Sequence, residues 1–401
     1  MRLIIASILC LTLFASCTKS DVVNLIIDNV NDIEEVSVNA DRESLGAQTT
    51  AIIDPLRIRA EEIASSLDDS LLASQVLISG IDGRGSLPLH VSQMLKNIPA
   101  GGVMLFRYNL NTSNEEIKNL LSETASLITE NSNIPPFIAV DHEGRYVNRF
   151  LPGVADLPDA SSYWNILQEE GREAALSKIE EDSFKAASII NELGINMNFA
   201  PVAEYLNDDN RDFLVHRSYG SDPFFTALAA GAFLQSMQKA GIICVVKHFP
   251  GTAGADPHYW VSVINGEKNE IDMLVFPFIY LINNGARAIM AAHSLVPLLD
   301  QRIASLSPAV MQDLLRGDLG FDGIIISDDF SMAAAGDFNK YEAAVQSIAA
   351  GADLILVWPP DLAHTHSAIL SALEEGELSR NRLQDAVQRI IYEKLRMGLM
   401  E

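Results

Sequence analysis

The chain has 401 residues, of which 48% are hydrophobic and 20% are charged, a composition typical of globular proteins and sufficient for one large α/β domain or two smaller ones. It carries 28 lysines and arginines against 53 aspartates and glutamates, which gives a formal charge of −25. Because phosphate contacts require clustered cations, this balance argues against nucleic acid as a partner and favours a solvated acidic surface.

The first residues predict export. Residues 1–16 contain one arginine, a short apolar run and several small residues, and Cys17 follows them. The run is too short to span a bilayer and resembles a bacterial lipoprotein signal in which Cys17 receives the lipid. We therefore expect a signal peptide over residues 1–16 and a membrane-anchored protein that faces the periplasm or the cell exterior. Phe14 stands where the lipoprotein pattern prefers leucine, so simple secretion is the alternative.

Residues 17–60 are rich in acidic residues and show no sustained period, which predicts a tether that leads into a helix. The main domain is expected from residue 61 to residue 401. Of the three cysteines, Cys10 leaves with the signal and Cys17 carries lipid, so Cys244 is left and no disulfide framework is predicted. Cys244 lies within an apolar run, which indicates a small core residue.

From residue 61 onward, short apolar runs alternate with longer helical patterns, which is typical of parallel βα units. A capping box of Ser113 and Glu116 opens one of the predicted helices. The eight runs predicted to be buried strands are residues 75–79, 102–106, 137–140, 195–199, 242–246, 288–292, 324–327 and 354–358. Eight such units fit a single (β/α)8 TIM-type barrel of the α/β class, with a doubly wound open sheet as the alternative. No glycine-rich nucleotide motif follows any run.

Polar residues stand where the predicted strands end, and in a barrel these ends carry the active site. They are Asp141, His142 and Glu143 after the third strand, Glu204 after the fourth, Lys247 and His248 at the end of the fifth, His293 after the sixth, and Asp328 with Asp329 after the seventh. Beyond the fifth strand, Asp256-Pro257-His258 places a carboxylate beside an imidazole on a short loop. We expect these side chains to meet at one end of the barrel.

Two of these groups suit the cleavage of a glycoside with retention. That reaction needs a carboxylate that attacks the anomeric carbon and an acid that protonates the leaving oxygen. Asp328 or Asp329 could attack, while the other could cap the following helix. His258 is the candidate acid, because imidazole titrates near neutrality and Asp256 would fix its tautomer.

These motifs together resemble glycoside hydrolase family 3, in its β-N-acetylglucosaminidase branch. The resemblance covers roughly residues 70–400 and is carried by the segments 140–144, 149–150, 198–202, 217–220, 247–251 with 256–258, 290–293 and 327–332. It implies an exo-acting, retaining β-N-acetylglucosaminidase that hydrolyses terminal N-acetylglucosamine from peptidoglycan or chitin-type oligosaccharides. It implies a covalent glycosyl-enzyme, a carbohydrate substrate, and no metal ion or organic cofactor.

The resemblance also implies roles for individual residues at matching positions. Asp328 would be the nucleophile, His258 the general acid/base and Asp256 its partner. The residues implied to bind the sugar are Asp141, Arg149, Arg217, Lys247, His248 and His293. Charged hydrogen bonds to hydroxyl groups suit this role, because they orient the sugar and strengthen as charge develops.

The chain departs from the family pattern at three places. Arg145 and Tyr146 follow Gly144 where the family has a second glycine and an arginine, so local packing is expected to differ. The loop from residue 251 to residue 256 is about two residues shorter than usual, and Pro257 replaces a serine. Since a displacement of about an ångström can cost roughly a hundredfold in rate, an altered pH optimum, slow turnover and a changed acceptor are all open outcomes.

Two rival functions are therefore kept. One is phosphorolysis, because a histidine acid/base repels a phosphate acceptor less than a glutamate does. The other is a sugar-binding lipoprotein with weak catalysis, against which the retention of Asp256, His258 and Asp328 argues. We expect a monomer.

Overall fold

A computed structural model describes residues 54–254, 256–332 and 339–401. The predicted signal peptide, the lipidation at Cys17 and most of the predicted tether lie outside the described residues. The predicted domain boundary at residue 61 falls inside the first described helix, α3 (Pro55–Ser66). Ala60 and Ala64 of this helix are buried, and α3 packs along the last helix of the chain, α15 (Arg380–Arg396).

The predicted (β/α)8 barrel is confirmed. Its strands are β1 (Leu77–Gly80), β2 (Gly102–Leu105), β3 (Phe137–Val140), β4 (Met197–Asn198), β5 (Ile243–Phe249), β6 (Ala288–Ala291), β7 (Ile324–Ser327) and β8 (Ile355–Val357). Each pairs in parallel with its sequence neighbours, and β8 also pairs with β1. A parallel bridge between Ile326 and Leu354 joins β7 to β8, so the sheet closes and the doubly wound alternative is wrong.

The eight strands lie close to the predicted apolar runs because a barrel strand is covered on both faces. Every residue of β1, β2, β3, β6 and β7 is buried. The largest difference is at β5, which continues through Lys247 and His248 to Phe249. These two polar side chains are themselves buried, at 3% and 6% exposure, so the strand does not end where its apolar run ends.

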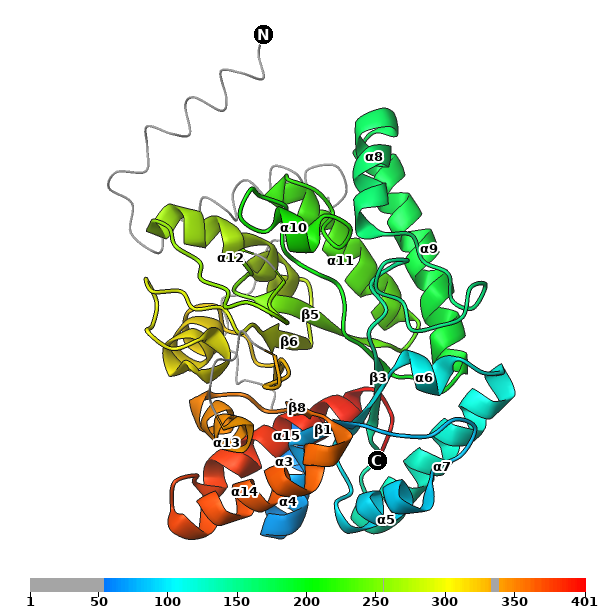
Figure 1. The fold of residues 1–401 in the computed structure, drawn as a ribbon, viewed down its shortest axis with the longest axis vertical. Helices are drawn as coiled ribbons and strands as arrows, with labels where there is room; N and C mark the ends of the chain where they lie inside the picture. Colours follow the sequence, from blue (N-terminus) through cyan, green and yellow to red (C-terminus); the bar gives the residue numbers. More distant parts are fainter. Residues whose placement is uncertain (1–53, 255, 333–338) are drawn as a thin grey trace, which may run out of the picture. The chain divides into compact units, whose positions relative to one another are not determined.

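Helices surround the strands in the ring that Figure 1 shows. Besides α3 and α15 they are α4 (Asp69–Gln75), α5 (Leu89–Asn97), α6 (Arg107–Leu110), α7 (Asn114–Ser132), α8 (Ala160–Glu170), α9 (Arg172–Glu192), α10 (Arg211–Leu214), α11 (Pro223–Lys239), α12 (Lys268–Asn283), η1 (Ala304–Leu306), η2 (Ala309–Asp318), α13 (Lys340–Ala350), η4 (Pro359–Asp361) and α14 (Leu362–Glu375). The predicted capping box is present at α7, where Ser113 accepts from the backbone of Glu116.

One lysine is enclosed by the barrel's outer layer. Lys394 of α15 is fully buried, and its Nζ donates to the carbonyl of Gly101 at 2.9 Å and to Oε1 of Gln75 at 3.2 Å. The ring of Phe137 lies 5.0 Å from the same Nζ. Among the residues that the structure describes, no carboxylate pairs with this lysine, and burial lowers the pKa of Lys394 to about 7.

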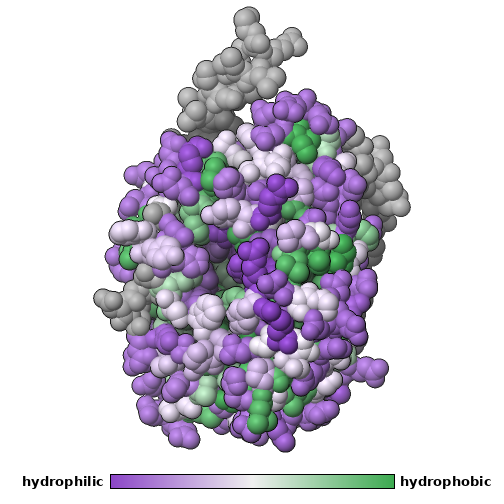
Figure 2. All heavy atoms as spheres, turned by 45° about the vertical axis from the view of Figure 1, so that its right-hand side comes forward, coloured by the Kyte–Doolittle hydropathy of each residue, from purple (hydrophilic) through white to green (hydrophobic). Residues whose placement is uncertain are grey.

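The visible surface agrees with the solvated exterior expected from composition. Figure 2 shows a face covered mostly by hydrophilic residues, with hydrophobic residues in small groups. Within the described part of the chain, no helix has the length and apolar character needed to cross a membrane.

Candidate active site

A cleft of about 360 Å³ lies where the strands end and their following loops begin. Of the residues singled out from the sequence, it is lined by Asp141, Arg149, Arg217, Lys247, His248, Asp256, His258 and Asp328. These side chains lie at the ends of four strands, β3, β4, β5 and β7, or in the loops that follow them, as expected for a barrel enzyme. The cleft thus gathers these eight side chains out of the larger set that the sequence predicted to meet, whereas His142, Glu204, His293 and Asp329 do not line it.

A network of buried and partly buried charges lines the cleft. The Nζ of Lys247 lies 2.9 Å from Oδ1 of Asp141 and 2.7 Å from Oε1 of Glu143. Arg217 pairs with both oxygens of Glu143, with Nε at 2.7 Å and Nη2 at 2.8 Å. Arg149 donates from Nη2 to Asp141 at 2.9 Å. Each charge therefore has a partner of opposite sign at hydrogen-bonding distance, as buried charges require.

This pairing keeps the groups of the network charged. Burial alone would raise the pKa of Asp141, but Lys247 and Arg149 outweigh it and hold that pKa below its usual value. Burial opposes the charge of Lys247 in the same way, and Asp141 with Glu143 raises its pKa overall. Arg149 keeps a further donor, since its buried Nε has no hydrogen-bond partner among the described residues.

Glu204 organises the end of β5 and the loop after it. Its Oε1 accepts from the backbone N–H of His248 at 3.1 Å and from Nδ1 of His248 at 2.7 Å. Its Oε2 accepts from the N–H and the hydroxyl of Thr252 at 2.6 and 2.7 Å. Burial would raise the pKa of Glu204, but these donors lower it overall, so the carboxylate stays ionised. The contact assigns the proton of His248 to Nδ1 and leaves Nε2 facing Arg217 at 3.4 Å.

The Asp256–His258 pair predicted from the sequence is formed. The Oδ1 of Asp256 accepts from Nδ1 of His258 at 2.6 Å and from the His258 backbone N–H at 2.9 Å. Partial burial raises the pKa of Asp256, but the hydrogen bonds from His258 lower it by more, so the carboxylate is ionised. The imidazole is accordingly held with Nε2 as the nitrogen available to exchange a proton. The ring of Phe213 packs edge-on against His258 at 6.5 Å.

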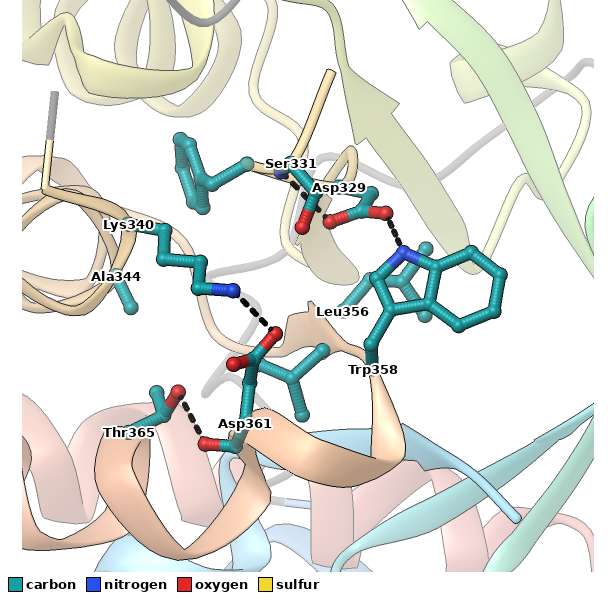
Figure 3. Close-up of a pocket in the computed structure, with 10 residues that line it drawn as sticks. Asp329, Ser331, Lys340, Ala344, Leu356, Trp358, Asp361 and Thr365 are labelled. Atoms are coloured by element: carbon teal, nitrogen blue, oxygen red, sulfur yellow. Dashed lines mark hydrogen bonds and ion pairs between the residues drawn. The ribbon is translucent and has the colours of Figure 1, made fainter. Parts of the chain in front are cut away.

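The two carboxylates after β7 have different surroundings. Asp329 accepts from the N–H of Ser331 at 2.9 Å and from the indole N–H of Trp358, and Figure 3 shows both contacts. Burial raises the pKa of Asp329. Asp328 lines the cleft instead and accepts from the N–H of Asp329 at 2.8 Å. The structure therefore favours Asp328 as the group that meets a substrate.

His293 is not brought into the cleft. Its Nδ1 lies 2.7 Å from the hydroxyl of Ser305, its Nε2 lies 2.9 Å from the carbonyl of Asp329, and its ring stacks on Phe330. Burial lowers the pKa of His293. With both nitrogens engaged and 3% of the residue exposed, His293 supports the segment that carries Asp328 rather than facing a sugar.

The first departure from the family pattern is visible beside the cleft. A Cβ on Gly144 would lie 2.6 Å from the carbonyl of Pro158, so a glycine is needed at that position. The next residue, Arg145, is exposed and does not line the cleft. Tyr146 does line it, and its ring lies 5.1 Å from that of His216.

Three residues of the site received no role from the sequence. Glu143 and Glu204 were noted at strand ends, but their partners lie 74 and 44 residues away along the chain, so nothing local indicated the pairing. Phe213 lies in the four-residue helix α10 and has no sequence signal of its own. Within the described residues, no group of three or more His, Cys, Asp or Glu side chains could hold a metal ion.

Comparison with known proteins points to one family. Residues 79–392 match the model of the glycosyl hydrolase family 3 N terminal domain. A beta-hexosaminidase of Methylococcus capsulatus is 35% identical over 287 residues, which is 70% of this chain and 81% of that protein. A beta-hexosaminidase of Hydrogenovibrio crunogenus is 34% identical over 74% of this chain and 83% of its own length.

Two solved structures share the fold. A family 3 beta-N-acetylglucosaminidase from Paenibacillus sp. str. FPU-7 superposes with a TM-score of 0.77 at 30% identity, covering 83% of this chain. The present chain spans 63% of that longer protein. NagZ from Neisseria gonorrhoeae, solved with N-trifluoroacetyl-D-glucosamine, superposes with a TM-score of 0.68 at 30% identity, covering 79% of this chain and 89% of that one.

Proposed function

The chain belongs to glycosyl hydrolase family 3, and on that premise we propose that it is an exo-acting, retaining β-N-acetylglucosaminidase. The observation that carries the proposal is one cleft lined by both an Asp-paired imidazole and a strand-end carboxylate. The names of the relatives at 34 and 35% identity support the choice of sugar. The substrates would be peptidoglycan or chitin-type oligosaccharides with terminal N-acetylglucosamine.

The proposed reaction uses these two groups in two steps. Asp328 attacks the anomeric carbon, and the bond to the leaving oxygen breaks as His258 gives that oxygen its proton. In the second step His258 takes a proton from water, the water oxygen attacks the same carbon, and Asp328 is released as a carboxylate. Asp256 acts as a positioning residue, because it holds Nδ1 of His258 and leaves Nε2 for both transfers. The charged network around Lys247 would bind and orient the sugar hydroxyls.

The proposal is tested by trapping and by turnover. Incubation with 5-fluoro N-acetylglucosaminyl fluoride followed by peptide mapping should place a covalent adduct on Asp328. Asp328→Asn should lower turnover of an aryl β-N-acetylglucosaminide by about 10³-fold or more, since it removes the nucleophile. Glu192→Gln, on the exposed face of α9, serves as the matched control. Wild-type-like turnover by Asp328→Asn would reject Asp328 as the nucleophile. No adduct and no turnover by the wild type, combined with sugar binding, would favour the sugar-binding alternative.

Phosphorolysis is separated by the product. Running the same assay in phosphate buffer should yield N-acetylglucosamine, whereas sugar 1-phosphate would identify a phosphorylase. We also propose that the protein is exported and anchored through lipid at Cys17, and that it acts as a monomer. The first of these rests on the residue pattern of positions 1–17. Cys17→Ser should then move the expressed protein from the membrane fraction to the aqueous fraction.

A further inference from the structure

Asp329 follows the proposed nucleophile, and hydrogen bonds fix both its main chain and its side chain. Its N–H donates to Oδ1 of Asp328 at 2.8 Å, and its carbonyl accepts from Nε2 of His293 at 2.9 Å. Its carboxylate accepts from the N–H of Ser331 at 2.9 Å and from the indole N–H of Trp358. The orientation of the Asp328 carboxylate therefore depends on how Asp329 is held.

Trp358 is the donor that ties this carboxylate to another strand. Ser331 lies two residues beyond Asp329 in the same loop, whereas Trp358 directly follows β8 and lies 29 residues away along the chain. Lys340 lines the same small pocket as Asp329, but its Nζ lies 2.7 Å from Oδ2 of Asp361. Figure 3 shows the amine turned toward Asp361 and the indole N–H pointing at the Asp329 carboxylate. The indole thus holds Asp329 while the nearby cation serves a different carboxylate.

A stack of three aromatic rings fixes the indole of Trp358. The ring centroids of Trp358 and Phe106 lie 4.7 Å apart with 9° between their planes, and Phe106 stacks in turn on Tyr108 at 5.8 Å and 17°. The hydroxyl of Tyr108 donates to the carbonyl of Ile81, just beyond β1, at 2.9 Å. A Cβ on Gly80 would lie 2.8 Å from the Phe106 ring, so a glycine at the end of β1 leaves the room that the stack occupies. The stack anchors the donor on the ends of β1, β2 and β8.

Burial does not require the contact between Trp358 and Asp329. Trp358 is 39% exposed and Asp329 is half-buried, so water could satisfy both the indole N–H and the carboxylate if they were apart. The contact instead directs the Asp329 carboxylate toward the end of β8 and away from the cleft, which Asp329 does not line. Adjacent carboxylates repel each other, and an Asp329 free to turn could bring a second negative charge beside the attacking oxygen of Asp328.

We propose that Trp358 is a positioning residue for glycoside cleavage, which holds Asp329 so that its main chain orients the Asp328 carboxylate for attack. The inference rests on the proposed function, because that function assigns Asp328 as the nucleophile. Phe106 and Tyr108 act one step further away, by holding the indole plane. Trp358 does not line the cleft and needs no contact with the sugar in this role. Its loss should therefore lower the rate of cleavage rather than the affinity for the sugar.

Trp358→Phe tests this role, because phenylalanine keeps a ring for the stack and removes the N–H. With an aryl β-N-acetylglucosaminide we expect kcat to fall by roughly 10–100-fold, since a displacement of about an ångström can cost about a hundredfold. KM and the inhibition constant of N-acetylglucosamine should change by less than about threefold. Trp164→Phe, which removes a half-buried indole of α8 outside the cleft, is the matched control and should keep the wild-type kcat.

Two further variants separate positioning from a general effect on packing. Because Trp358 acts through Asp329, adding Trp358→Phe to Asp329→Ala should lower kcat by less than about twofold more. Phe106→Leu keeps the indole N–H but removes the ring on which it stacks, and it should also lower kcat if Trp358→Phe does not fold.

Three results would overturn this inference: fully additive losses in the double variant, an unchanged kcat in Trp358→Phe and Phe106→Leu, or a rise in KM alone. The proposed function would stand in each case, because wild-type turnover and the Asp328 adduct do not depend on Trp358 being the group that positions the nucleophile. Absence of turnover and of an adduct in the wild type would instead overturn the proposed function.

Discussion

Replacing Glu204 with glutamine tests whether a single buried carboxylate holds the catalytic loop in place. Glu204 is 2% exposed and accepts four hydrogen bonds, two from His248 and two from Thr252. Glutamine has the same shape but offers one oxygen and one amide group. Its NH2 must therefore face the N–H of either His248 or Thr252, so that two donors meet.

The structure sets the expected size of the effect. A hydrogen bond to a charged group contributes about 1.5–3 kcal/mol, a neutral one contributes about half of that, and an unsatisfied buried donor costs about 1–3 kcal/mol. The lower cost of burying an uncharged side chain offsets part of the sum. We expect Glu204→Gln to lower the free energy of unfolding by about 3–5 kcal/mol, the range for breaking a buried charged pair. At about 2.1 cal/mol/K of unfolding entropy per residue, this corresponds to roughly 4–7 °C in Tm for a body of roughly 350 residues.

Thermal unfolding followed by circular dichroism measures this shift, and aryl glycoside turnover below the transition measures the effect on the loop. We expect kcat/KM to fall at least about tenfold, because Thr252 leads into the loop that carries Asp256 and His258. Glu192→Gln breaks an exposed pair with Lys118 and should change the stability by less than about 1 kcal/mol. A Glu204→Gln protein as stable and as active as Glu192→Gln would refute the reasoning.

Two other predictions concern charge. Asp256→Asn should lower kcat by roughly 10–100-fold, because Asp256 positions the proposed acid/base His258. It should change the free energy of unfolding by less than about 1 kcal/mol, because the Asp256 and His258 side chains are 41% and 59% exposed. Turnover within twofold of the wild type would count against a role for the pair in catalysis. The pKa of Lys394 is about 10.4 in the unfolded chain and about 7 in the folded protein. Between these pH values the unfolded chain binds one more proton than the folded protein, so the contribution of Lys394 to the free energy of unfolding rises with pH. The change in Tm from pH 7 to pH 9 should therefore be less positive for Lys394→Met than for the wild type. Identical changes in the two proteins would contradict the burial argument.

The barrel was predictable because its strands are short, apolar and regularly separated by helices. The ends of the strands were less predictable. Strand β5 carries Lys247 and His248 inside the barrel, where carboxylates that follow other strands form ion pairs or hydrogen bonds with them. No property of residues 242–249 alone could have indicated those contacts. The same limit applies to Glu143 and Glu204, whose partners are distant in sequence.

Within the site, local patterns predicted local contacts. The Asp256–His258 pair spans two residues and formed as expected. The choice between Asp328 and Asp329 was open in the sequence, and the indole of Trp358, 29 residues from Asp329, favours Asp328. His293 shows the opposite case, because a histidine at a strand end indicated a role in the cleft whereas Ser305 and the carbonyl of Asp329 occupy both its nitrogens.

The segment from residue 145 to residue 150, which follows β3, gives protein engineers two separable sets of positions. Changes at Tyr146, Val147 or Arg149 alter the surface of the cleft, whereas changes at Arg145 or Asn148 alter a second cavity, of about 710 Å³, that these two residues line. Phe150 is too deeply buried for free variation. A combinatorial library confined to positions 145 and 148 could therefore reshape the second cavity while the residues that line the cleft stay unchanged.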